Sequence, residues 1–265
     1  MPLLEEYHLG TNYIGRPVRR YDVLESTNTL ALAYADDPSH QGLVVWADWQ
    51  TAGRGRFGRR WLSSPGSAVL LSVVVFPPPR FQRPVFLTAW AAVAVCETVY
   101  LTTQRQPRIK WPNDVLLAGK KVCGILIEQS QGVVVGIGLN VTTPPQFFLD
   151  NDLPQAGSLA CFTNRALNVT DVGHLLIERL DSGYVTLLQG AVAELESAWR
   201  WYSGLWGREV VMLLTNGERC TGRLREWSFD GLVLESAGEP RLYLPEEIAE
   251  IETLPTWPQS AEHLG

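Results

Sequence analysis

Apolar positions along the chain follow two periods, one typical of strands and one typical of helices. A continuous β-branched run over 68–76, closed by three prolines, predicts a strand buried on both faces. A second pair of strands, over 122–129 and 133–141, is predicted to form a hairpin through the Gln131-Gly132 turn. Shorter apolar runs predict further strands over 21–25, 42–48, 108–111 and 115–116.

Helices are predicted in three places. Ser26 suits the N-cap position of a helix over 27–35, and the Ala-rich segment 85–101 fits a buried helix. Leucines recur with helical spacing between 171 and 202. No apolar run reaches the roughly 18 residues that span a bilayer, so no membrane partner is expected. Strands and helices mix without regular alternation, which predicts an α+β fold with a mixed or antiparallel sheet flanked by helices.

A boundary between two domains is predicted near 203–207. Beyond it, Asn216-Gly217 and Asp230-Gly231 favour two-residue turns between short strands. We therefore expect a main domain over 1–204 and a small C-terminal β-barrel, or partial barrel, over 205–265.

Charge is distributed unevenly over the chain. The formal net charge of -6 argues against a general binder of DNA or other nucleic acid. Yet the segment 53–60, which we call the Arg/Gly loop, carries four arginines and no acid. Such a concentrated positive loop on an acidic protein suggests a small anionic ligand. The four cysteines match no metal or redox spacing, and no signal peptide is evident, so a cytoplasmic location is expected.

The Arg/Gly loop combines flexible backbone with fixed positive charge. Its glycines let backbone N–H groups approach an anion, and its arginines supply bidentate donors, which suits phosphate or an acyl phosphate. An exposed hairpin loop with solvated arginines explains the same residues. Gly53, Gly55 and Gly58 match the dinucleotide-binding spacing, but that motif requires a helix where a strand is predicted here. The chain also lacks the Gly-Lys-Ser/Thr of a Walker A loop.

Three further segments carry candidate chemistry. In the segment 110–128, Lys121 leads into an apolar strand, where its ammonium can pair with a carboxylate or phosphate, and Asn113 can bind a base or ribose. A surface turn at Pro112-Asn113 is the simpler explanation. Gly136 and Gly138 share one face of a strand and leave a flat slot for a planar ligand, unless they mark a bulge or close packing. Ser26-Thr27-Asn28 is fully explained by a helix cap.

Taken together and in this order, these segments resemble the biotin–protein ligases. The matching stretches are STN at 26–28, QTAGRGRFGRRW at 50–61, KWPNDV at 110–115, KKVCGILIE at 120–128 and GIGLNV at 136–141. The resemblance covers nearly the whole chain. It implies a class II synthetase-like catalytic fold with an SH3-like C-terminal β-barrel. It also implies ATP and biotin as substrates, a requirement for Mg²⁺ with unknown metal ligands, and transfer of biotin to a biotin carboxyl carrier protein.

The resemblance also implies a role for each matching residue. Lys121, Arg56 and Asp114 would be catalytic, with Lys121 binding the biotin carboxylate and Asp114 assisting attack by the acceptor lysine. Residues expected to bind biotin are Ser26, Thr27, Asn28, Gln50, Gly53, Arg54, Gly55, Arg56, Lys121, Gly124 and Gly138. Residues expected to bind ATP or the adenylate are Arg54, Arg56, Trp111, Asn113, Lys121 and Asn140, with the 147–148 phenylalanines as another aromatic neighbourhood.

Some properties depart from the family or stay open. Only 25 residues precede Ser26, too few for the N-terminal DNA-binding domain of some members, so no repressor role is expected. Phe57 stands where many relatives have a basic residue. A homodimer is possible. The alternatives are a lipoate ligase or lipoyl/octanoyl transferase, which shares the catalytic fold, and a non-enzymatic module that only holds an anion.

Overall fold

The computed structural model describes residues 2–254 and divides into two compact units, one up to Ser203 and one from Gly204 onward. The first unit is built on an eight-stranded sheet and the second on a five-stranded sheet. Independent folding of the segments 1–204 and 205–265, which would define them as domains, stays a prediction.

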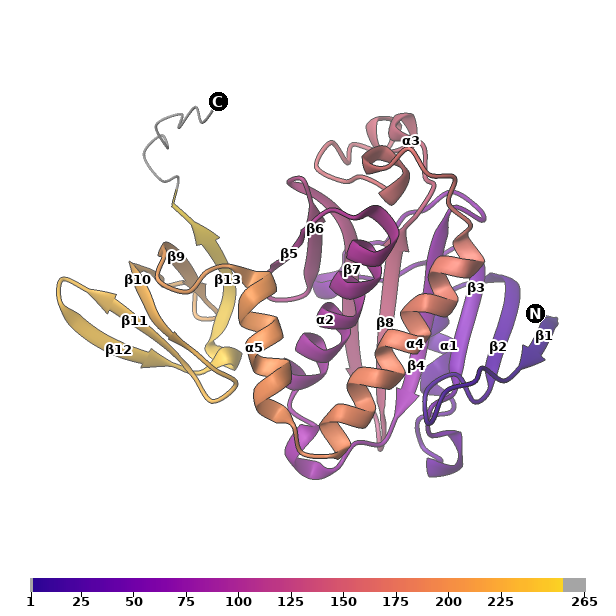
Figure 1. The fold of residues 1–265 in the computed structure, drawn as a ribbon, viewed down its shortest axis with the longest axis horizontal. Coiled ribbons are helices and arrows are strands. Elements are labelled where there is room, and N and C mark those ends of the chain that lie inside the picture. The colour runs from indigo at the N-terminus through magenta and orange to yellow at the C-terminus, as the bar shows by residue number, and fades with distance from the viewer. Residues whose placement is uncertain (1, 255–265) are drawn as a thin grey trace. The chain divides into compact units, whose positions relative to one another are not determined.

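The eight-stranded sheet has the spatial order β1-β2-β3-β4-β8-β7-β6-β5 (Figure 1). Among these strands β2 and β3 run parallel, whereas the other neighbouring pairs are antiparallel. The mixed sheet confirms the expected α+β fold. Its strands are β1 (Leu3–Tyr7), β2 (Val18–Leu24), β3 (Val44–Gln50), β4 (Ala68–Val75), β5 (Pro107–Lys110), β6 (Asp114–Leu117), β7 (Lys120–Gln129) and β8 (Val133–Asn140).

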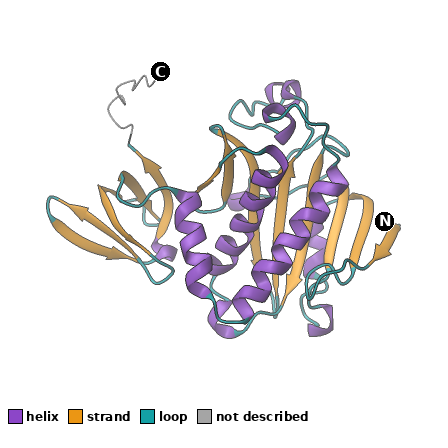
Figure 2. Cartoon of the chain, in the orientation of Figure 1, coloured by secondary structure: helices purple, strands orange, loops and turns teal. Residues whose placement is uncertain are grey.

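Five α-helices accompany this sheet, and they alternate with strands in no regular way (Figure 2). They are α1 (Thr27–Leu32), α2 (Pro84–Thr103), α3 (Pro145–Asp150), α4 (Val169–Leu188) and α5 (Val192–Ser203). The single helical region expected over 171–202 is therefore two helices. Gly190 separates them with a φ of 85°, a left-handed conformation that ends a helix at little cost for glycine.

Helices cover both faces of the sheet. Side chains of β3 alternate between the two faces, so successive residues pack against different helices. Val45 and Ala47 lie in a buried cluster with Ala31 of α1. Trp46, between them, faces α4, where a Cβ on Gly173 would lie 1.9 Å from its ring. On the α4 side, α2 lies beside α4, and the indole N–H of Trp90 donates to the Leu180 carbonyl at 2.9 Å (Figure 1).

Helix α2 extends the expected 85–101 helix at both ends. By length and average hydropathy alone it would suffice to cross a membrane, the one such helix within residues 2–254. A share of 67% of its apolar window is buried inside the structure. A buried core helix has this same composition, so the finding is weak evidence for a membrane.

A buried carboxylate attaches the segment before β2 to α4. Asp181 is 4% exposed and accepts hydrogen bonds from the backbone N–H groups of Asn12, Tyr13 and Ile14 at 2.7–2.9 Å. The side chain of Asn12 donates a fourth at 3.1 Å. Burial alone raises the pKa of Asp181, but these donors outweigh it and lower the pKa below its usual value.

The second unit is an antiparallel sheet in the order β12-β11-β10-β9-β13. Its strands are β9 (Glu209–Leu214), β10 (Arg219–Trp227), β11 (Leu232–Ser236), β12 (Glu239–Tyr243) and β13 (Ile248–Thr253). The expected turn at Asn216-Gly217 joins β9 to β10, with Gly217 at a φ of 88°. Of the expected barrel or partial barrel, the closed form is not found, because in the described residues β12 pairs only with β11 and β13 only with β9.

We predict that Asp181→Asn lowers the free energy of unfolding by about 2 kcal/mol at neutral pH, because one carboxylate oxygen becomes an NH₂ group and the backbone N–H groups that face it lose their acceptor. The folded pKa is depressed, so this contribution is complete above the unfolded pKa and is lost as pH falls through the folded value. Urea unfolding at pH 7 and near pH 3 measures both. The exposed Asp22→Asn is the control. A pH-independent difference between Asp181→Asn and the wild type would contradict the prediction.

Candidate active site

The candidate site lies on the face of the central sheet where β4, β8 and β7 meet. Strand register places Ser72, Gly136 and Leu126 in one row across this face. The next row contains Gly138 and Gly124. Two of the three strands therefore present glycines here, and other segments can approach the backbone of the sheet directly.

Trp61, at the end of the Arg/Gly loop, lies flat over one glycine pair. A Cβ on Gly138 would fall 2.4 Å from its ring, and one on Gly124 would fall 2.9 Å from it. At the two glycines where a flat slot was expected, the structure shows close packing: the Asn28 amide lies against Gly136 and the Trp61 indole against Gly138. Sequence reasoning gave Trp61 no role, although an aromatic residue closing a glycine-rich loop was the available signal.

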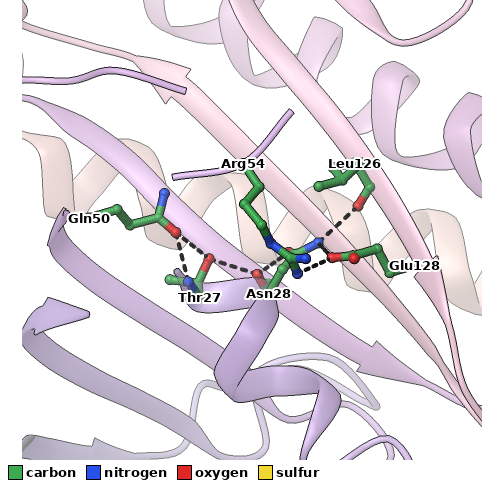
Figure 3. A network of polar contacts seen from close by, with 7 residues as sticks. Thr27, Asn28, Gln50, Arg54, Leu126 and Glu128 are labelled. Atoms are coloured by element: carbon green, nitrogen blue, oxygen red, sulfur yellow. Dashed lines mark hydrogen bonds and ion pairs between the residues drawn. The ribbon is translucent and has the colours of Figure 1, made fainter. Parts of the chain in front are cut away.

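Thr27 and Asn28, both buried, form part of a polar network (Figure 3). Ser26 occupies the N-cap position of α1, yet its side chain makes no capping hydrogen bond. Gln50 takes that role, since its Oε1 accepts from the backbone N–H of Thr27 at 2.7 Å. Because a backbone N–H only donates, the Gln50 amide must face Thr27 with its oxygen, and its NH₂ group points away (Figure 3).

Asn28 is fixed from both ends of its amide. The fully buried Ser72 hydroxyl lies 2.5 Å from Asn28 Oδ1 and 2.7 Å from Thr27 Oγ1. On the other side, Asn28 Nδ2 donates to Glu128 Oε2 at 2.8 Å. The same Glu128 oxygen accepts from Arg54 of the Arg/Gly loop at 2.6 Å. Ser72 and Glu128 were missed from the sequence, because only the strand register brings them here.

A β-bulge turns Lys121 towards the slot. The pairing of β6 with β7 shifts between Val115 and Leu116, which leaves Val122 without an opposing residue. Bulges of this kind redirect a side chain. As a result the Lys121 side chain folds over Gly124, and its ammonium forms an ion pair with Asp114 at 2.7 Å. It also lies 5.9 Å from the centre of the Trp61 ring.

Arg56 reaches the same place from the loop. Its Nη1 donates to Asn113 Oδ1 at 3.3 Å, beside the Asp114 that holds Lys121. Burial lowers the pKa of Arg56, and the charge of Asp114 acts in the opposite direction. The guanidinium of the loop and the ammonium of Lys121 thus converge on Asn113-Asp114, the arrangement on which an acyl-phosphate site depends.

The expected adenine contacts are less clearly assembled. Asn113 Nδ2 donates to the Ile125 carbonyl at 2.7 Å, and Asn140 Nδ2 donates to the Gly157 carbonyl at 3.1 Å. Asn140 Oδ1 is buried without a hydrogen-bond partner in the described part of the chain. Trp111 is 6% exposed and its ring packs near Trp199 of α5, a core position that does not support stacking on adenine. Phe148 is likewise buried.

A hollow of about 610 Å³ lies under the Arg/Gly loop. The loop closes as a hairpin, with Gly55 N–H donating to the Arg59 carbonyl at 2.7 Å and Trp61 N–H donating to the Gly53 carbonyl at 2.9 Å. The hollow has Leu126 and Glu128 of β7 on its other side. It is large enough for a small organic ligand and is lined by guanidinium groups.

Comparison with known proteins identifies the family. The model of the biotin/lipoate A/B protein ligase family matches residues 21–140. The biotin–[acetyl-CoA-carboxylase] ligase of Mycobacterium tuberculosis is 34% identical over 250 residues, which cover 89% of this chain and 91% of that protein. The chain belongs to the biotin/lipoate protein ligase family.

Other relatives in the ligase family agree with this fold. A biotin protein ligase from Aquifex aeolicus, solved in complex with biotin and ATP, is 25% identical, with a TM-score of 0.73 and coverage of 89% of this chain and 99% of that one. The bifunctional ligase/repressor BirA of Bacillus subtilis is 33% identical over 203 residues. The match covers 62% of that protein, so the chain spans less than two thirds of its length.

In this member of the ligase family, Phe57 gives the loop tip an unusual character. Phe57 is 78% exposed and has a φ of 56°, rare for a bulky residue. The Arg56 guanidinium lies 4.8 Å from the centre of its ring. Where a third basic residue would add charge, the aromatic ring contacts Arg56 instead.

We predict that Gly136→Ala lowers the free energy of unfolding by about 2 kcal/mol, because over-packing a well-filled site costs this much. The new Cβ would lie 2.0 Å from Asn28 Oδ1, which is held in place by its hydrogen bonds. Chemical unfolding measures the loss. In an Asn28→Ala background the obstacle is gone and the same substitution should cost less than half as much. Equal costs in both backgrounds would show that Asn28 does not limit the space at Gly136.

Proposed function

We propose that this chain is a biotin–protein ligase. It activates biotin with ATP to biotinyl-5′-AMP and transfers the biotinyl group to a lysine of a biotin carboxyl carrier protein. The observation that carries this proposal is the convergence of Arg56 and Lys121 beside Asp114, at one end of a slot floored by glycines. The names of the relatives support the substrates and the acceptor.

The slot suits biotin in its distribution of polar groups. At one end the NH₂ group of Gln50 is available as a donor to a ureido oxygen, near the buried Ser26, Thr27 and Asn28. In the middle, Gly124 and Gly138 leave room for a flat ring once the Trp61 indole moves aside. At the other end the Lys121 ammonium offers a partner for a carboxylate, a role that Asp114 fills in this structure.

Activation requires charge stabilisation around one phosphorus atom. The biotin carboxylate attacks the α-phosphorus of ATP, a new C–O–P linkage forms, and pyrophosphate leaves. Negative charge grows on the phosphate oxygens, where Arg56, Lys121 and the N–H groups around Gly53 and Gly55 would stabilise it. Asn113 holds Arg56 at 3.3 Å, so little reorganisation is needed.

Transfer requires protection of the adenylate and activation of an amine. The Arg/Gly loop would cover the mixed anhydride and exclude water. The acceptor lysine then attacks the biotinyl carbonyl, and AMP leaves. Asp114, released from Lys121, would accept the proton of the incoming ammonium. Asn113 and Asn140 would lie near the adenine, with the buried Asn140 Oδ1 as an acceptor for its amino group.

The described residues do not form a dedicated Mg²⁺ site. They contain no cluster of three or more His, Cys, Asp or Glu side chains that could hold a metal ion. The two carboxylates near the slot, Asp114 and Glu128, are each paired with a cation. We propose that Mg²⁺ is bound mainly by the ATP phosphates. A cytoplasmic location, a homodimer and the absence of DNA and membrane partners remain part of the proposal.

The test of the proposed function is ATP–pyrophosphate exchange with biotin, with lipoate, and with neither. We expect exchange that depends on biotin. The family model also covers lipoate ligases, so exchange with lipoate alone would assign the chain to that branch. No exchange with either acid would leave a module that binds an anion without catalysis.

We predict that Lys121→Ala lowers the rate of biotin-dependent exchange by about 100-fold or more, because it removes a charge that stabilises the transition state. Saturating exchange kinetics measure this change. The matched control is the adjacent Lys120→Ala, since Lys120 donates to the Pro154 carbonyl at 2.6 Å and takes no part in the slot. Near-normal exchange by Lys121→Ala would refute the assignment of Lys121.

A further inference from the structure

Glu128 lies on the ligand face of β7 but far from the reacting groups. Alternation along the strand puts Gly124, Leu126 and Glu128 on one face, and Lys121 folds over Gly124. Glu128 follows Gly124 by four residue steps along the strand, roughly 13 Å at the usual rise. The Glu128 carboxylate therefore cannot touch an acyl phosphate held at Lys121, and any role in the reaction is indirect.

One oxygen of Glu128 joins two segments that are distant in sequence. Glu128 Oε2 accepts from Arg54 Nη2 at 2.6 Å and from Asn28 Nδ2 at 2.8 Å (Figure 3). Arg54 belongs to the Arg/Gly loop, and Asn28 is at the start of α1. The carboxylate thus connects the loop with the floor of the slot.

The charge of Glu128 also decides how Asn28 is oriented. A carboxylate only accepts hydrogen bonds, so it must face the NH₂ group of Asn28. The carbonyl of Asn28 then faces Ser72, the fully buried hydroxyl on β4. The Leu126 carbonyl, 3.4 Å from Asn28 Nδ2, favours the same orientation, so a neutral side chain at position 128 would leave only this long contact to hold the amide.

We propose that Glu128 is a positioning residue: it fixes the Asn28 amide and anchors the base of the Arg/Gly loop, so that the loop closes over biotin from a fixed end. This inference rests on the proposed function of the slot. The Arg54–Glu128 ion pair is partly exposed, because 42% of the Arg54 side chain and 25% of the Glu128 side chain are accessible to solvent. Such pairs contribute little to overall stability, so the effect falls on ligand binding rather than on folding.

The first experiment compares Glu128→Gln with the wild type in biotin-dependent exchange. We expect KM for biotin to rise about 10-fold, with kcat within about twofold, because anchoring affects bound substrate and transition state alike. The urea midpoint should stay unchanged, which a purely structural residue would not allow. Glu178→Gln, an exposed carboxylate on α4, is the matched control and should leave KM unaltered.

The second experiment asks whether Arg54 and Glu128 act together. If the shared contact is responsible, Arg54→Gln raises KM to a similar degree, and the double variant is little worse than either single one. If the two residues acted independently, the effects of the two substitutions would multiply, and KM would rise about 100-fold in the double variant. Multiplying effects, or a wild-type KM in Glu128→Gln, would overturn the proposal.

The third measurement needs no catalysis. The loop contains four arginines, so limited trypsin digestion reports how often it opens. Glu128→Gln should speed cleavage at Arg59 and Arg60 several-fold, whereas Glu178→Gln should not. Unchanged cleavage would overturn the anchoring role. If the wild type shows no biotin-dependent exchange but the variant is cleaved faster, the proposed function fails and the anchor stands.

Discussion

The site depends on a patch of β-sheet that has no side chains. Gly124, Gly136 and Gly138 lie on one face of β7 and β8, and a methyl group on any of them would collide with Asn28 or Trp61. A sheet face normally holds neighbouring segments away by the length of its side chains. Here an amide and an indole ring rest directly on the backbone, and the loop and helix that carry them come within reach of one another.

The second requirement is a local break in the regular pattern of the sheet. Without the bulge at Val122, residues 120 and 122 rather than Lys121 would share a face with Gly124. The distorted edge is supported from outside, since Lys121 N–H donates to the Gln155 carbonyl and the Lys121 carbonyl accepts from Gly157 N–H, at 2.8 and 2.9 Å. These backbone contacts fix the position of the lysine, and the side chain of Asp114, directly opposite Gly124, forms an ion pair with its ammonium.

The sequence predicted the elements whose signal is carried by many residues. The β-branched run of β4, the β7–β8 hairpin and helix α2 all formed near the expected positions. Strand β1 was missed, because its LLEEY segment is mostly exposed and has no apolar face. The open sheet of the second unit was not predicted either, because the local sequence of a strand does not show whether the two edge strands pair. In the site, the resemblance implied roles for Lys121 and Arg56, which the structure brings close to Asn113-Asp114, whereas Ser72 and Glu128 depend on strand register, which a single sequence does not show.

The orientation of the Gln50 and Asn28 amides is set by neighbouring groups that can only donate or only accept a hydrogen bond. The Thr27 N–H can only donate and the Glu128 carboxylate can only accept, so the amides of Gln50 and Asn28 have one orientation each. The slot therefore has an amide donor at one end, a middle where the Trp61 indole lies over glycines and must move aside for a ligand, and two cations at the other end. A ligand that matches it needs an acceptor, a flat apolar body and an anion in that order. Under the proposed function, this order favours a biotin-like molecule over a plain fatty or dithiolane acid, because such an acid offers no acceptor to the half-buried amide of Gln50.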